Sequence, residues 1–284
     1  MRDPTRPRKT DPTVQPWAEA SSPLSMAVSA RDRDICDMVR LSLRKGRVML
    51  AFQPVMQLAE PMGIAFHEAL LRVLDRKGRV IPARDFMGVA EKHELGRMLD
   101  SMALDLGLKT LEDVPALRLS INMSAHSIGY RPWQAVLDTR LKRDPTIGER
   151  LILEITEQSA NDMPDIVQAF MKEMHMRGVS FALDNFGDGY SSLKYLRDFY
   201  FDILKIDGGL VHNMHKNPDN RVLTQAIISL ARHFDMFTVA QNVENQSDAE
   251  LLAHLGIDCL QGYYFGAPTL APVWLDEQDS ARSA

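Results

Sequence analysis

Ionisable and amide side chains recur in or just after short apolar runs along most of this chain of 284 residues. Each run is short enough to be one buried strand. Carboxylate and amide oxygens are the ligands that hard divalent cations prefer, and a lysine inside an apolar run needs a charged partner. Side chains of these types at one rim are suited to gripping a divalent cation and a phosphate. The positions are Glu68, Asn122, Glu154, Asp184, Lys205 and Glu244.

Stretches long enough for a helix separate most of these runs, and this alternation predicts a single α/β barrel. In such a barrel the carboxyl ends of the strands carry the chemistry. Glu68 falls inside its run, so its strand must be displaced or curved to reach that rim. We expect strands at residues 48–56, 64–74, 117–122, 151–156, 179–184, 203–206, 237–243 and 259–265. We expect helices at residues 30–45, 82–93, 96–111, 132–142, 163–176, 220–234 and 247–255.

Each position also has a plain structural interpretation. A single acid after a strand is usually a helix cap or a solvated loop residue, which is the simpler interpretation of Glu154 taken alone. Asn122, followed by Ser124, is also typical of a turn. Lys205 is harder to explain in this way because a buried lysine requires a partner. The recurrence at six strands therefore favours a site over six coincidences.

Composition limits the classes of partner. A formal net charge of −5 and a pI near 5.9 argue against a nucleic-acid polymer. Cys36 and Cys259 are the only cysteines, and we expect two free thiols in a reducing cytoplasm. No apolar run approaches the ~20 residues of a membrane span, and the N-terminus lacks the apolar core of a signal peptide.

The sequence divides into three parts. Residues 1–30 are rich in proline and charge, which predicts a disordered tail in which Trp17 is the one large aromatic residue. Residues 31–275 are expected to form the barrel domain, and residues 276–284 a flexible C-terminus.

The ordered set of motifs resembles the EAL domain family, the cyclic di-GMP phosphodiesterases and their degenerate relatives. The resemblance runs from about residue 33 to 272 with every block in order. The blocks are Gln53-Pro54, Glu68-Ala69-Leu70-Leu71-Arg72, Ile121-Asn122-Met123-Ser124, Leu153-Glu154-Ile155-Thr156-Glu157, residues 183–193, Leu204-Lys205-Ile206-Asp207, Ala240-Gln241-Asn242-Val243-Glu244 and Gln261-Gly262-Tyr263.

The resemblance implies a TIM-like (β/α)8 barrel with one antiparallel strand and two Mg²⁺ or Mn²⁺ ions beside a scissile phosphodiester. It assigns the first metal to Glu68, Asn122, Glu154 and Asp184. It assigns binding of cyclic di-GMP to Gln53, Leu71, Arg72, Asp184, Lys205, Glu244 and Gln261. It also implies a homodimer that pairs near the loop 184–193, where Asp188 replaces a residue that is commonly small.

Two positions depart from the family pattern. Asn185 stands where the pattern has a second aspartate, and Gln241 stands where it has a glutamate that works with the second metal and the attacking water. The amides keep the size and one acceptor oxygen but lose the charge. We therefore expect metal at one site at most, with the second site lost.

Three functions follow from this pattern. The favoured one is a catalytically degenerate protein that binds cyclic di-GMP and relays it to a protein partner, which the sequence does not identify. The second is a weak phosphodiesterase that yields pGpG, and the third is a purely protein-binding scaffold. The retention of Gln53, Arg72 and Glu244 weighs against the third.

Overall fold

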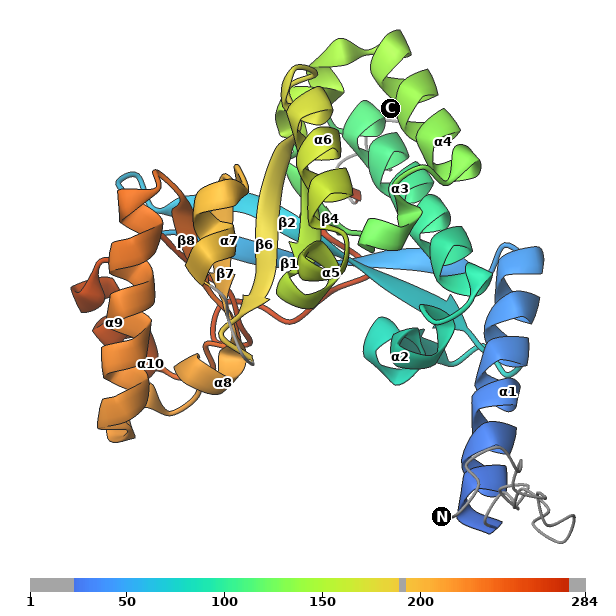
Figure 1. Ribbon diagram of the computed structural model, residues 1–284, viewed down its shortest axis with the longest axis horizontal. Helices are drawn as coiled ribbons and strands as arrows, with labels where there is room; N and C mark the ends of the chain where they lie inside the picture. Colours follow the sequence, from blue (N-terminus) through green and yellow to red (C-terminus); the bar gives the residue numbers. More distant parts are fainter. Residues whose placement is uncertain (1–22, 189–192, 276–284) are drawn as a thin grey trace, which may run out of the picture.

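The computed structural model describes residues 23–188 and 193–275 (Figure 1). Its first helix, α1 (Pro23–Arg44), begins seven residues earlier than expected, since proline is tolerated in the first turn of a helix. The expected tail therefore overlaps α1 over residues 23–30. The rest of that tail, with Trp17, and the expected C-terminal segment 276–284 lie outside the described residues.

The strands close into a barrel, as the sequence predicts. Their order is β1-β9-β8-β7-β6-β5-β4-β2-β3, and a further pairing of β1 with β2 closes the ring, so that β3 lies outside it on β2. Strand β1 is antiparallel to both of its neighbours, β2 and β9, whereas β2 and β4 to β9 are mutually parallel. The strands are β1 (Val48–Gln57), β2 (Gly63–Leu74), β3 (Val80–Pro82), β4 (Leu119–Asn122), β5 (Leu151–Thr156), β6 (Ser180–Phe186), β7 (Ile203–Ile206), β8 (Phe237–Ala240) and β9 (Cys259–Leu260).

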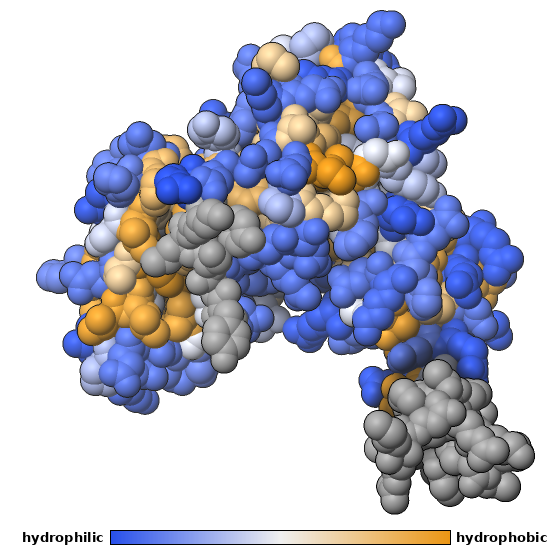
Figure 2. Space-filling view, in the orientation of Figure 1, coloured by the Kyte–Doolittle hydropathy of each residue, from blue (hydrophilic) through white to orange (hydrophobic). Residues whose placement is uncertain are grey.

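Helices cover the outside of the barrel (Figure 1). They are α2 (Met87–Ala90), α3 (Glu94–Asp113), α4 (Arg131–Arg143), α5 (Glu157–Asp162), α6 (Pro164–His175), α7 (Leu193–Asp198), α8 (Gly208–Val211), α9 (Pro218–His233) and α10 (Gln246–Leu255). On the face in Figure 2, apolar side chains gather on the side of the molecule where Figure 1 places α9. Val222 and Leu223 of α9 are exposed. The predicted homodimer stays a prediction.

Several predicted elements differ from the structure. The expected helix 82–93 is instead the end of β3, a 3-10 turn η1 (Ala83–Asp85) and the short α2. The strands β8 and β9 are shorter than expected, and the sequence did not indicate α5, α7 or α8. These elements are four to six residues long, too short to show a helical period.

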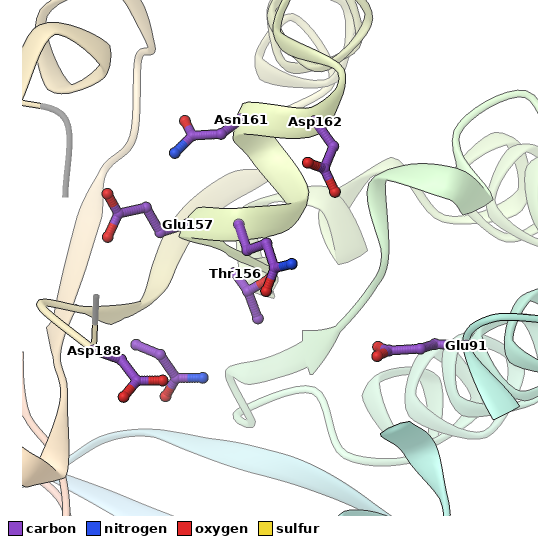
Figure 3. Close-up of a pocket in the computed structure, with 8 residues that line it drawn as sticks. Glu91, Thr156, Glu157, Asn161, Asp162 and Asp188 are labelled. Carbon is purple, nitrogen blue, oxygen red and sulfur yellow. The ribbon is translucent and has the colours of Figure 1, made fainter. Parts of the chain in front are cut away.

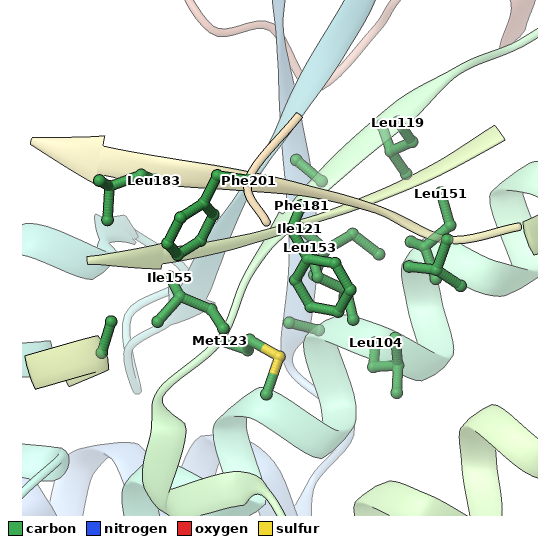
Figure 4. Close-up of a cluster of buried hydrophobic side chains, with 14 of the residues drawn as sticks. Leu104, Leu119, Ile121, Met123, Leu151, Leu153, Ile155, Phe181, Leu183 and Phe201 are labelled. Atoms are coloured by element: carbon green, nitrogen blue, oxygen red, sulfur yellow. The ribbon is translucent and has the colours of Figure 1, made fainter. Parts of the chain in front are cut away.

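Two hydrophobic layers hold the barrel. Side chains on the outer face of β4, β5 and β6, such as Ile121 and Leu153, pack under helices, where Leu104 of α3 belongs to the same cluster (Figure 4). A second layer fills the interior of the barrel: Val55, Phe66, Ile152, Ala182, Ile203, Val239 and Cys259.

The two cysteines are free thiols, as predicted, and the structure shows that both are buried. Cys36 lies in α1 and Cys259 in β9. No helix in the described part of the chain is long and apolar enough to span a membrane.

Candidate functional site

The polar site lies directly above the apolar layer inside the barrel. Successive inward side chains along a strand are two residues apart. In each parallel strand, the inward side chain above the apolar layer therefore belongs to the residue two positions after the apolar one. In β1, which runs in the opposite direction, it belongs to the residue two positions before. The resulting residues are Gln53, Glu68, Glu154, Asp184, Lys205, Gln241 and Gln261, with Asn122 two positions beyond the buried Ser120.

Glu68 reaches this rim because β2 continues past it. Glu68 pairs with Ser120 of β4 and with Gln53 of β1, and the later part of β2 pairs with β1 and β3 only. The sequence predicted that the strand containing Glu68 would be displaced or curved. In the structure β2 instead extends beyond the barrel, so that Glu68 lies at the rim although it falls inside its strand.

Lys205 lies at the centre of the site and is fully buried. Its Nζ donates hydrogen bonds to Glu68 Oε2 at 3.0 Å and to Glu154 Oε2 at 2.6 Å, and it lies 3.3 Å from Asp184 Oδ1. A buried ammonium group is stable only with such partners. The structure thus brings together four of the predicted residues from four strands.

Three amides complete this network around Glu68. Gln261 Nε2 donates to Glu68 Oε2 at 2.6 Å, and Asn122 Nδ2 donates to Glu68 Oε1 at 2.9 Å. Gln261 Nε2 also lies 3.3 Å from Gln53 Oε1, and Gln53 Nε2 donates to the carbonyl of Gly266 at 3.0 Å. Each of these side chains is held in place by another member of the site.

Burial and mutual repulsion separate the pKa values of the acids. Burial, with repulsion from Glu68, raises the pKa of Glu154 to about 8 despite the contact with Lys205. Burial likewise raises the pKa of Asp184. Burial opposes ionisation of Glu68, but Lys205 and the Gln261 and Asn122 hydrogen bonds lower its pKa overall. The three carboxylates keep the pKa of Lys205 well above its usual value although burial acts in the other direction. Burial and repulsion thus favour the protonated forms of Glu154 and Asp184, whereas Glu68 is favoured as the carboxylate.

The two departures from the family pattern have different surroundings. Gln241 Nε2 donates a hydrogen bond of 2.8 Å to Asp184 Oδ1, on the same oxygen that Lys205 approaches. Asn185 has a positive φ of 56°, a conformation in which asparagine is enriched. Asn185 lines a separate cavity of about 450 Å³ whose wall carries the acids Glu91, Glu157, Asp162 and Asp188 (Figure 3).

A ligand-sized cavity of about 410 Å³ lies beside the buried cluster, and Gln53 belongs to both. We call it the arginine cavity, because Arg72 and Arg84 line it together with Gln53, Asn242, Glu244 and Tyr263. Glu244 Oε2 also lies 3.5 Å from Nδ1 of His212, and both of these side chains are about half exposed.

Leu71 does not face this cavity. Its side chain is buried in the hydrophobic core, because alternation along β2 places Leu70 and Arg72 on the cavity side and Leu71 on the other. The carbonyl of Leu71 accepts a 2.9 Å hydrogen bond from Arg72. Leu71 thus contacts a predicted ligand residue through its backbone.

Sequence reasoning missed three polar side chains of the arginine cavity: Arg84, Asn242 and Tyr263. Arg84 was hidden inside the expected helix 82–93. Asn242 and Tyr263 lie within recognised motifs, and Asn242 adopts a positive φ of 55°. An asparagine in the turn after a strand was the one available signal for Asn242.

The sequence pattern of the EAL domain matches residues 37–268. The chain belongs to the EAL domain family. Cyclic di-GMP phosphodiesterase PdeF of Escherichia coli is 30% identical over 249 residues, covering 86% of this chain and 33% of PdeF. MucR of Pseudomonas aeruginosa, named as a bifunctional diguanylate cyclase/cyclic di-GMP phosphodiesterase, is 29% identical over 252 residues, covering 86% of this chain and 36% of MucR. The chain spans about a third of the length of these curated relatives.

Solved EAL structures share this fold. The PaMucR phosphodiesterase in complex with c-di-GMP has a TM-score of 0.73 and 28% identity, covering 85% of this chain and 99% of that one. The FimX EAL domain of Pseudomonas aeruginosa bound to c-di-GMP has a TM-score of 0.75 at 24% identity, covering 84% of this chain and 97% of that one. The second likeness shows the fold alone.

The metal ions implied by the EAL family can be compared with the buried donors. Among the described residues, no three His, Cys, Asp or Glu side chains are arranged so that they could together hold a metal ion. The carboxylates instead surround Lys205. The donor chemistry nevertheless fits a hard cation, because Glu68, Asn122, Glu154 and Asp184 all carry oxygen donors and the buried Glu154 Oε1 has no hydrogen-bond partner.

Proposed function

We propose that this EAL domain binds cyclic di-GMP without appreciable hydrolysis and relays the bound state to a protein partner. One observation carries the proposal: the amide of Gln241 donates its hydrogen bond to Asp184, whose carboxylate the resemblance assigns to the metals. A glutamate at position 241 would place a second carboxylate against Asp184 and would call for a cation between them. The amide removes that need.

The charge of the site supports the same conclusion. Glu68, Glu154, Asp184 and Lys205 sum to −2 when all are ionised (three negative charges and one positive), which one divalent cation balances. Carboxylates at positions 185 and 241 would raise this to −4, which matches two such cations. Two-metal hydrolysis uses both ions, one on the attacking and one on the leaving oxygen. An amide also cannot accept a proton from water, and loss of a general base typically costs ~10²–10⁴-fold in rate.

We propose that one Mg²⁺ or Mn²⁺ at most is held, by Glu68, Asn122, Glu154 and Asp184. A bound ion there would polarise a phosphate oxygen of the ligand. The lone acceptor Glu154 Oε1 supports this choice. The second position is lost because Asn185 and Gln241 contribute no negative charge.

The binding half of the proposal rests on the arginine cavity. Arg72 supplies a guanidinium group suited to a phosphate oxygen, and Gln53 and Glu244 supply polar groups on the same wall. Lys205, Asp184 and Gln261 lie in the buried cluster that Gln53 joins to this cavity. Retention of this constellation weighs against a purely protein-binding scaffold.

A weak phosphodiesterase is the second candidate. The four oxygen-bearing side chains of the first metal are all present, and the relative PdeF is named a cyclic di-GMP phosphodiesterase. This function requires turnover with a single metal or with a rescued second metal site. An assay for pGpG distinguishes this function from that of a receptor, which would form no product.

Calorimetry with cyclic di-GMP, in EDTA and in Mg²⁺, combined with chromatography of the incubated ligand, tests the proposal. We expect micromolar or tighter binding, no appreciable pGpG, and much weaker binding by Arg72→Ala. Robust conversion to pGpG would establish the enzyme instead. A Kd of ~1 mM corresponds to a binding free energy of only about −4 kcal/mol. Absence of binding up to ~1 mM ligand would therefore favour the purely protein-binding scaffold.

A further inference from the structure

The arginine cavity contains two guanidinium groups that the protein itself leaves poorly neutralised. Among the described residues, no carboxylate forms an ion pair with Arg72, whose hydrogen bond goes to the carbonyl of Leu71. Arg84 has one carboxylate contact, with its chain neighbour Asp85 at 3.7 Å, and both side chains are largely exposed. Exposed pairs of this kind contribute little, so Arg84 is free to bind another anion.

Strand pairing places these two arginines on one cavity. Strand β3 is antiparallel to β2, with Pro82 opposite Arg72. The turn η1 follows at once and carries Arg84 two residues beyond Pro82. Pro82 and Arg84 both line the cavity into which Arg72 faces.

The two like charges act on each other. Burial lowers the pKa of Arg72, and the positive charge of Arg84 lowers it further, while the smaller effects of Glu68, Tyr263 and Asp85 raise it. Two guanidinium groups beside one cavity repel unless an anion lies between them, and guanidinium groups bind phosphate oxygens through paired hydrogen bonds. A phosphodiester is an anion of the required charge and geometry.

We propose that Arg84 is a second phosphate-binding arginine, which with Arg72 clamps a phosphodiester group of the ligand and sustains its binding without a metal ion. The inference deepens the proposed function and rests on it. It supplies the positive charge that the lost second metal would otherwise bring to the ligand. Arg84 thereby becomes a determinant of affinity in a segment outside the EAL motifs.

The test is calorimetry of cyclic di-GMP in EDTA with the full chain and three variants. Arg84→Ala removes the charge, Arg84→Lys keeps the charge but loses the planar fork, and Arg143→Ala is the control. Arg143 is an exposed arginine of α4 that does not line the cavity. Thermal unfolding of each variant checks its fold, which the exposed position of Arg84 should leave unchanged.

We expect Arg84→Ala to weaken binding at least about tenfold, the effect of losing one charge-assisted hydrogen bond, and Arg84→Lys to be intermediate. Arg143→Ala should match the wild-type chain. The gap between wild type and Arg84→Ala should narrow as salt rises, because the Debye length falls from about 10 Å at 0.1 M to about 3 Å at 1 M.

The outcomes separate this inference from the proposed function. Wild-type binding in EDTA with unchanged affinity of Arg84→Ala would overturn the inference and leave the receptor intact. Binding by the wild-type chain only when Mg²⁺ is present would overturn the metal-free clamp. Absence of wild-type binding under both conditions would overturn both proposals.

Discussion

Replacing Gln241 by glutamate reverses the one contact on which the receptor proposal depends. The amide Nε2 lies 2.8 Å from Asp184 Oδ1, and the side chain of Asp184 is only 9% exposed. The substitution preserves size and shape and changes a donor into a negative charge. In the absence of metal we expect Gln241→Glu to be destabilising, and we expect divalent metal to reverse the effect.

The magnitude follows from the geometry. If the two carboxylates relax to about 4 Å apart, their repulsion is about 4 kcal/mol at an effective dielectric near 20. Loss of the hydrogen bond to a charged group adds about 1.5–3 kcal/mol. The full sum is not reached, because one of the two acids can take up a proton and so remove the repulsion. Taking up that proton costs about 1.4 kcal/mol for each unit by which the pH exceeds the pKa of the acid. We therefore expect a net loss of about 2–4 kcal/mol at pH 8.

The sign of the pH dependence is fixed by the same argument. Burial already raises the pKa of Asp184 in the wild-type chain. The carboxylate that Gln241→Glu introduces should raise this pKa further. A carboxyl group whose folded pKa is raised stabilises the folded state at low pH, and this contribution is lost as pH rises through the raised value. The deficit of Gln241→Glu should therefore be larger at pH 8 than at pH 5.

Thermal unfolding in EDTA and in Mg²⁺, at both pH values, measures these effects. A loss of this size corresponds to about 5–10 °C in Tm for a domain of this length, and Mg²⁺ should restore Tm in the variant far more than in the wild type. Gln246→Glu is the matched control. Gln246 donates at 2.6 Å to Glu250 on the exposed face of α10, where a like-charge pair costs only about 0.2–0.5 kcal/mol.

An equal Tm for Gln241→Glu and Gln246→Glu in EDTA would refute the reasoning, as would a variant that Mg²⁺ fails to stabilise. The first result would mean that the Gln241 hydrogen bond does not balance Asp184. The second would mean that a carboxylate at position 241 does not create a cation site.

Two further predictions concern turnover and metal binding. The double variant Asn185→Asp with Gln241→Glu should gain hydrolysis of cyclic di-GMP to pGpG in Mg²⁺ or Mn²⁺, seen by chromatography. Each single change should gain less because both act on one metal and one water; a silent double variant would point to further damage in the loop that follows Asn185. Because the pKa of Glu154 is raised to about 8, Mn²⁺ must displace a proton to use this carboxylate. Its affinity should rise about tenfold per pH unit below that value and level off above it. Calorimetry in two buffers of different ionisation enthalpy should show about one proton released per ion, and a pH-independent affinity without proton release would contradict the assignment.

The sequence alone determined the barrel and most of the buried cluster. The short apolar runs around Glu154 and Lys205 predicted strands with both residues near one rim. The structure then showed that both side chains are buried and meet inside the barrel. The order of the motifs then indicated the family. These conclusions depend on local pattern, and the tertiary structure did not change them.

Tertiary structure decided how the charges and cavities are arranged. Only the closure of the sheet places Lys205 among three carboxylates and the amide of Gln241 against Asp184. The sequence wrongly predicted a helix over 82–93, because a short strand and a 3-10 turn carry too few residues to show a period. The pairing of β3 with β2 brings Arg84 to Arg72. The two strands form a hairpin whose turn contains Gly78 at a φ of 78°, a local signal that the prediction of a helix over 82–93 did not take into account.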